Sequence, residues 1–192
     1  MAWVPLAVGP SQAYAHSPVP GIEGFYIGLL HPFSTPSQFL SMVGLALLVS
    51  SFELKMARWL LTVFLTGSLM GLMVGQQLSE PDPALFAVAC AICVLAALSP
   101  GRLALLAVGL VGIGGYLIGV ASIPDDGPTR DRLFTMSGSF VGANLGLLYL
   151  FGIIIFIRER YIWSWVGIAF RVVAAWVGTI ALLMLALAFT RV

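Results

Sequence analysis

The sequence predicts an all-α integral membrane protein: a bundle of six transmembrane helices, preceded by a short N-terminal segment that re-enters the bilayer or lies at its interface. The composition is 60% hydrophobic and only 9% charged, whereas soluble domains carry about 25% charged residues. Apolar runs of nearly bilayer-spanning length fill the chain from Pro36 onwards, and a span needs about 20 such residues. Because lipid cannot satisfy backbone N–H and C=O groups, these runs must form helices.

Polar and turn-forming residues separate the six apolar runs. Glu53, Lys55 and Arg58 lie between the first two runs, a Ser-Pro-Gly-Arg turn begins at Ser99, and the longest polar loop covers residues 124–132. Proline and glycine favour such turns and end helices. The predicted spans are residues 36–51, 57–78, 83–99, 102–123, 133–157 and 163–189.

An N-terminal segment, residues 1–35, precedes the transmembrane domain, residues 36–192. Residues 21–30 are apolar but too few to span, so we expect them to lie along the interface or to re-enter where protein covers them. The first residues are similar to a signal peptide, with a cleavage-like Ala-Tyr-Ala at 13–15 and no basic residue before it. We expect this segment to be uncleaved or vestigial.

Lysine and arginine in short loops set the orientation of a polytopic membrane protein, because more of them stay in the cytoplasm. One set of predicted loops carries five: Lys55, Arg58, Arg102, Arg158 and Arg160. The opposite set carries three: Arg130, Arg132 and Arg191. We therefore expect the first set in the cytoplasm, both termini outside, and the bacterial cytoplasmic membrane as the location.

Small residues recur in two of the predicted spans with a period of four. The repeating glycines of the second and fifth spans are Gly67, Gly71, Gly75, Gly138, Gly142 and Gly146. Lipid gives helices no hydrophobic reason to associate, so glycine faces act by letting two backbones approach and gain dispersion energy. We expect these faces to contact other helices.

Two polar residues lie deep within the predicted spans, where such residues are costly. Asn144 is near the middle of the fifth span, and we expect it to donate a hydrogen bond to another helix, with a ligand role as the alternative. Arg171 lies eight residues beyond Trp163, about 12 Å along a helix. It either extends to the interface or pairs with Glu53. Bulky side chains on most sides of the sixth span suit lipid or a partner subunit.

The stretch GFYIGLLHPFSTPSQFLSM resembles the opening signature of the HupE/UreJ family of small polytopic membrane proteins. The matching positions are Gly24, Phe25, Gly28, His31, Pro32 and Met42. Residues 142–146 and 171–187 also look like this family. The family's Asp-His pair falls on Ser37 and Gln38. The resemblance implies a scaffold for nickel or cobalt uptake in hydrogenase and urease maturation, from which this chain has lost the most diagnostic ligand pair.

Nickel and cobalt suit imidazole nitrogen with carboxylate support, whereas serine and glutamine are neutral. The chain has two histidines, His16 and His31, so a metal site within one subunit would need mixed ligands. The candidates are His31, His16 and Glu23, with nickel or cobalt as the ion and copper less favoured. The alternative is that His31 caps a helix or bonds a carbonyl group. An isolated CxxC, Cys90 and Cys93, is interpreted as packing.

The sequence holds no glycine-rich nucleotide-binding motif and no nucleophile–histidine–acid set. The chain has only two histidines and few buried acids, the residue types that most often transfer protons in enzymes. We therefore expect no enzymatic activity. A net charge of +1 does not favour nucleic acid as a partner. Two functions remain. The first is a non-catalytic accessory or structural subunit of a larger membrane complex, joined through the sixth helix. The second is a divalent-metal permease of the HupE/UreJ type with altered ligands.

Overall fold

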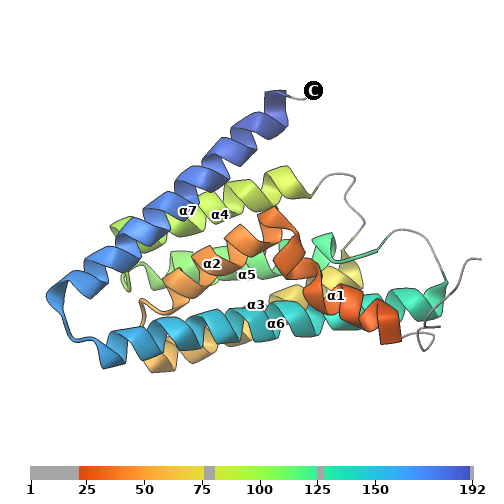
Figure 1. Ribbon diagram of the computed structural model, residues 1–192, viewed down its shortest axis with the longest axis horizontal. Helices are drawn as coiled ribbons and strands as arrows, with labels where there is room; N and C mark the ends of the chain where they lie inside the picture. The colour runs from red at the N-terminus through yellow and green to blue at the C-terminus, as the bar shows by residue number, and fades with distance from the viewer. Residues whose placement is uncertain (1–21, 76–80, 125–127, 191–192) are drawn as a thin grey trace, which may run out of the picture.

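The computed structural model describes residues 22–75, 81–124 and 128–190, and within these ranges it contains seven α-helices and no strand (Figure 1). Their bounds are α1 Ile22–Ser34, α2 Pro36–Val49, α3 Leu54–Val74, α4 Asp82–Leu98, α5 Ala104–Ala121, α6 Thr129–Arg160 and α7 Ser164–Thr190. From α2 onwards the helices alternate in direction between two ends. We call these the Asp82 end, where α4 and α6 begin, and the Arg158 end, where α4 and α6 finish.

Four helices of the described chain are long and apolar enough to cross a bilayer: α3, α5, α6 and α7. The helices α1 and α2 pass the same test only together, as a pair bent by 68°, and α4 falls short with 17 residues. By length and composition the described chain therefore has four candidate spans, or five if the bent pair counts as one, and the predicted six spans are not confirmed. The sequence prediction treated residues 36–51 as one complete span. The helix α2 has only 14 residues and rises about 21 Å, whereas the hydrocarbon core of a bilayer is about 30 Å thick.

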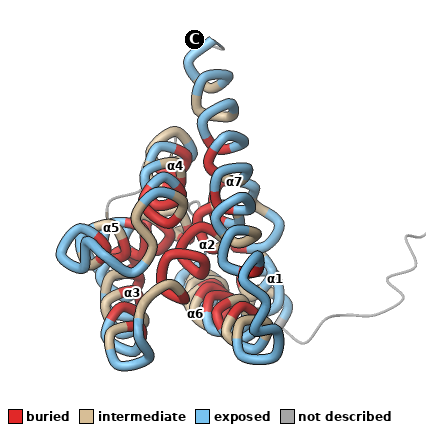
Figure 2. The backbone as a smooth tube through the Cα atoms, turned by 90° about the vertical axis from the view of Figure 1, so that its left-hand side faces the viewer, coloured by how far each residue is buried: buried red, intermediate tan, exposed pale blue. Residues whose placement is uncertain are grey.

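The helix α2 forms the centre of the bundle. Ten of its fourteen residues are buried, and Figure 2 shows the other helices arranged around it with their buried residues facing inwards. The helix α7 is the opposite case, with only Val166, Ala174, Gly178 and Ala181 buried. Its outer face carries large apolar side chains such as Trp176, which is 71% exposed. That exposure suits a lipid solvent.

Three helix pairs pack most closely: α3 with α5, α1 with α6, and α4 with α7. Each pair has glycine at its contact. A Cβ atom added to Gly67 would lie 2.8 Å from a carbonyl oxygen of α5, one on Gly142 would overlap the Leu29 carbonyl of α1, and one on Gly178 would lie 2.9 Å from the Cys93 Cβ. Larger residues would force these helices apart. The glycine repeat of α6 therefore faces α1, which the sequence had not identified as its partner.

Two arginines connect helices near the Arg158 end. The Arg158 Nη1 donates to the Ser50 carbonyl oxygen at 3.1 Å, and its guanidinium carbon lies 5.0 Å from the centre of the Phe170 ring. The Arg171 Nε donates to the Ala97 carbonyl oxygen at 2.6 Å. Arg171 therefore binds the last turn of α4, where a cation also complements the helix dipole.

Candidate functional site at the break between α1 and α2

A single non-helical residue, Thr35, separates α1 from α2. Its backbone is extended, with φ −96° and ψ 112°, and Pro36 follows at the first position of α2. A proline ring disfavours helical backbone in the residue before it and suits the first helical position, where its missing N–H is not needed. The Thr35 N–H and the Ser34 hydroxyl both donate to the His31 carbonyl oxygen at 3.1 Å. This local chemistry produces the bend.

Three polar side chains follow the break on the first turns of α2, and all are buried. Ser37 and Ser41 are 0% exposed and Gln38 is 1% exposed. The Ser37 Oγ donates to an Asp82 carboxylate oxygen at 2.5 Å, and the Gln38 Nε2 donates to the Ala121 carbonyl oxygen at 3.4 Å. These contacts join the N-termini of α2 and α4 to the C-terminus of α5.

The other polar atom of the Gln38 side chain, Oε1, is buried and has no hydrogen-bond partner within the described residues. Exchanging the two amide atoms would place Oε1 against another acceptor, the Ala121 carbonyl, so the hydrogen bond decides the orientation of the amide. An unmatched buried acceptor costs about 1–3 kcal/mol. Such groups call for water or a ligand as a partner.

The structure separates Glu23 from His31, two of the three metal residues predicted from the sequence. His16 lies outside the described residues. Glu23 is exposed in the first turn of α1, and His31 is in its last turn, about 12 Å further along the helix axis. In the part of the chain that the structure describes, no three His, Cys, Asp or Glu side chains are placed to hold one metal ion.

Asn144 forms a second polar contact, away from the break. Its Nδ2 donates to the Ser68 Oγ of α3 at 3.2 Å and to the Phe140 carbonyl oxygen of its own helix at 2.9 Å. The amide therefore links α6 to α3 within the bundle. Five residues before it on α6, the Ser139 hydroxyl is buried and lacks a partner among the described residues.

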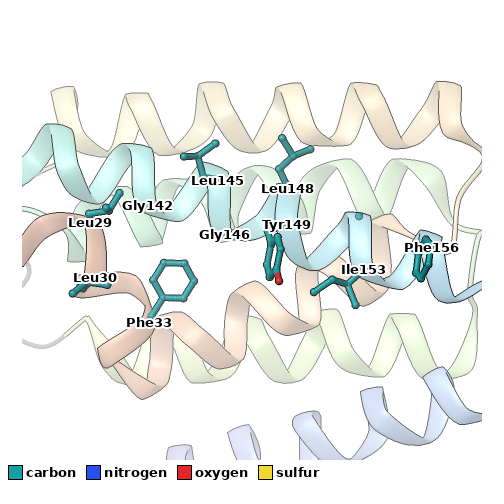
Figure 3. Close-up of a pocket in the computed structure, with 11 residues that line it drawn as sticks. Leu29, Leu30, Phe33, Gly142, Leu145, Gly146, Leu148, Tyr149, Ile153 and Phe156 are labelled. Atoms are coloured by element: carbon teal, nitrogen blue, oxygen red, sulfur yellow. The ribbon is translucent and has the colours of Figure 1, made fainter. Parts of the chain in front are cut away.

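An open groove of about 790 Å³ runs between α1 and α6 (Figure 3). Its lining is Leu29, Leu30, Phe33, Gly142, Leu145, Gly146, Leu148, Tyr149, Gly152, Ile153 and Phe156. The Tyr149 hydroxyl is the one polar side-chain group in that set. The groove suits hydrocarbon and offers no charged ligand to an ion, so the polar break is the better candidate site.

Sequence reasoning missed Asp82 as a site residue. It is separated from Ser37 by 45 positions, and no local periodicity relates the two. One signal was present: Asp82 directly precedes Pro83 after a polar stretch, which is typical of a helix N-terminus. The contact between Asp82, at the start of α4, and Ser37, at the start of α2, arises only from the tertiary fold.

Apolar helices of spanning length, glycine-mediated helix contacts and a bent helix pair with buried polar groups at its break together indicate a multi-pass α-helical membrane protein. The family model described as HupE / UreJ protein matches residues 4–187, nearly the whole chain. The chain therefore belongs to the HupE/UreJ family, which confirms the resemblance seen near His31. No curated protein and no solved structure matches it.

Proposed function

We propose that this chain is a permease that carries a divalent metal ion across the membrane, with the break between α1 and α2 on the ion's path. Family membership supports this, since the HupE/UreJ resemblance implies nickel or cobalt uptake. The observation that carries the proposal is the 68° bend between α1 and α2, with Ser37 and Gln38 buried next to it. Transporters commonly place substrate sites where a membrane helix is interrupted, because free polar groups of the backbone and side chains meet there.

The sequence alone favoured a non-catalytic accessory subunit, on the loss of the Asp-His pair and the bulky last helix. Family membership supports the permease better. If the break only joined helices, the unpaired Gln38 Oε1 would bring no benefit, because an unpaired buried acceptor lowers stability. An ion or its water would provide the missing partner.

The same proposal includes an orientation. With the Arg158 end in the cytoplasm of a bacterial cell, as the lysine and arginine distribution predicts, the Asp82 end faces outwards. Asp82 is exposed whereas Ser37 and Gln38 are buried. An ion arriving from outside would then meet the exposed carboxylate before the buried amide.

Uptake by purified protein in liposomes tests the proposal. The vesicles contain a metal-sensitive dye, and Ni²⁺, Co²⁺, Mn²⁺ or Mg²⁺ is added outside. We expect at least one ion to enter faster than in protein-free vesicles. Gln38→Leu keeps the bulk but removes both polar atoms, and should slow this uptake about tenfold, the equivalent of one lost buried polar interaction.

The matched control is Thr62→Val on α3. Thr62 is exposed, and its hydroxyl bonds the Arg58 carbonyl oxygen of its own helix at 3.0 Å, so this variant should transport normally. If wild-type protein moves none of the four ions faster than empty vesicles do, the permease is refuted and the accessory subunit becomes the better explanation.

A further inference from the structure

We infer that the break binds its ion through oxygen atoms alone, namely the Asp82 carboxylate, the Ser37 hydroxyl and the Gln38 Oε1. The ion that fits is a partly hydrated divalent cation of the Mg²⁺ class, in place of nickel or cobalt. This inference rests on the transport function proposed above and names its cargo. It arises because the ligands that the fold assembles differ from those that the family resemblance implies.

The chemistry of the donor set selects the ion class. Carboxylate, carbonyl and water oxygens suit magnesium, calcium and manganese, whereas imidazole suits nickel and its neighbours. Magnesium commonly keeps several waters and uses only one or two carboxylates. A site with the single carboxylate of Asp82, one hydroxyl and one amide oxygen matches that pattern of few protein ligands.

The arrangement of these atoms supports a ligand at the break. Ser37 donates to Asp82 and so holds the carboxylate beside the start of α2. On the next residue, the Gln38 amide is held by Ala121 through its nitrogen, which leaves Oε1 without a partner although the side chain is 1% exposed. The residue next to the one that holds the Asp82 carboxylate therefore carries a buried, unpaired oxygen acceptor. That acceptor is available to a cation or to a water bound to it.

The local charge also favours a cation, though weakly. The N-termini of α2 and α4 each contribute roughly half a positive charge, which together offset the Asp82 carboxylate. The C-termini of α1, at Ser34, and of α5, at Ala121, each add roughly half a negative charge. A small net negative potential suits an ion that keeps part of its hydration and leaves again, as transport requires.

Neither of the two residues that would make the site suitable for nickel takes part in the described hydrogen bonds between α2, α4 and α5. His31 enters the hydrogen bonds of the described structure through its backbone carbonyl, and Glu23 lies at the far end of α1. An imidazole ligand is therefore absent from the contacts that join α2, α4 and α5 in the described chain.

Binding of Mn²⁺ to the purified protein tests the inference without requiring transport. Electron paramagnetic resonance measures free Mn²⁺, whose signal falls when the ion binds protein. We expect Mn²⁺ to bind and Mg²⁺ to displace it. Asp82→Asn should lower the affinity for Mn²⁺ at least about tenfold. Even mutation of a residue that only supports a metal ligand lowers metal affinity by about tenfold or more. Asp82→Glu, which keeps the carboxylate, should retain most of the binding.

Two further variants serve as controls. Asp131→Asn removes an exposed carboxylate at the same end of the bundle and should leave Mn²⁺ binding unchanged, as should His31→Ala. Loss of binding in His31→Ala, equal binding in wild type and Asp82→Asn, or no Mn²⁺ binding by wild type would each overturn the inference.

Uptake measurements separate this inference from the permease proposal. Nickel or cobalt uptake that depends on His31 and not on Asp82 would support the permease and refute the oxygen site. Mn²⁺ binding that depends on Asp82, without uptake of any ion, would refute the permease and leave the site standing. In the double variant Ser37→Asp with Gln38→His, Ni²⁺ should displace Mn²⁺ at a lower concentration than in wild type, because the variant adds an imidazole at the break.

Discussion

Gly44 of α2 faces Cys93 of α4 in the centre of the bundle, and this contact allows a quantitative test of the packing. A Cβ atom on Gly44 would lie 2.8 Å from the Cys93 Sγ, 3.4 Å from the Ile92 Cγ2 and 3.8 Å from the Ala89 carbonyl oxygen. Only the sulfur is too close. It would have to retreat by about 0.6 Å, from 2.8 Å to 3.4 Å, to make room for alanine.

The expected cost follows from two opposing terms. Overpacking a close-packed core costs about 1–3 kcal/mol, while replacing glycine by alanine inside a helix gains about 0.5–1 kcal/mol. We therefore expect Gly44→Ala to lower the free energy of unfolding by up to about 2.5 kcal/mol. In a Cys93→Ala background the sulfur is gone, and the same substitution should become stabilising by up to about 1 kcal/mol.

The assay is denaturant unfolding of the four proteins of this double-mutant cycle in mild detergent, with the coupling energy taken from the cycle. Gly109→Ala is the control, because no heavy atom lies within 4 Å of the added Cβ, so it should be neutral or stabilising. If Gly44→Ala costs the same free energy with and without Cys93, the proposed clash is not what limits the packing of α2 against α4.

The remaining predictions concern other helix contacts and the orientation. Gly142→Ala should destabilise more than Gly44→Ala, since backbone atoms of α1 block the added Cβ and no side-chain truncation can make room; equal unfolding midpoints would contradict this. Arg158→Met should lower the free energy of unfolding by about 1–3 kcal/mol, because it removes the donor to the Ser50 carbonyl oxygen just after α2; an unchanged midpoint would refute that role. In a cysteine-free background, Lys55→Cys should resist an impermeant thiol reagent in intact cells whereas Thr129→Cys should be labelled; the reverse pattern would invert the orientation.

The sequence by itself determined the class of protein and the approximate position of every helix. Hydrophobicity is a property of each segment, and lipid forces an apolar segment to satisfy its own backbone, so no tertiary information was needed. The last predicted span, 163–189, differs from α7, Ser164–Thr190, by one residue at each end. The signature around His31 likewise pointed to the HupE/UreJ family before any fold was known.

Only the tertiary structure showed that α1 and α2 meet at a 68° bend and which helices pack against each of them. The Thr35-Pro36 pair predicts from local sequence that the helix is interrupted. The position of α1 after that interruption depends on a tertiary contact, its packing against Gly138 and Gly142 of α6. The tertiary structure also decided which residues lie together at the candidate site. Ser37 acquires a carboxylate partner from the start of α4, Asp82, because α2 and α4 begin at the same end of the bundle. Contacts between residues so far apart arise from packing, which local periodicity does not encode.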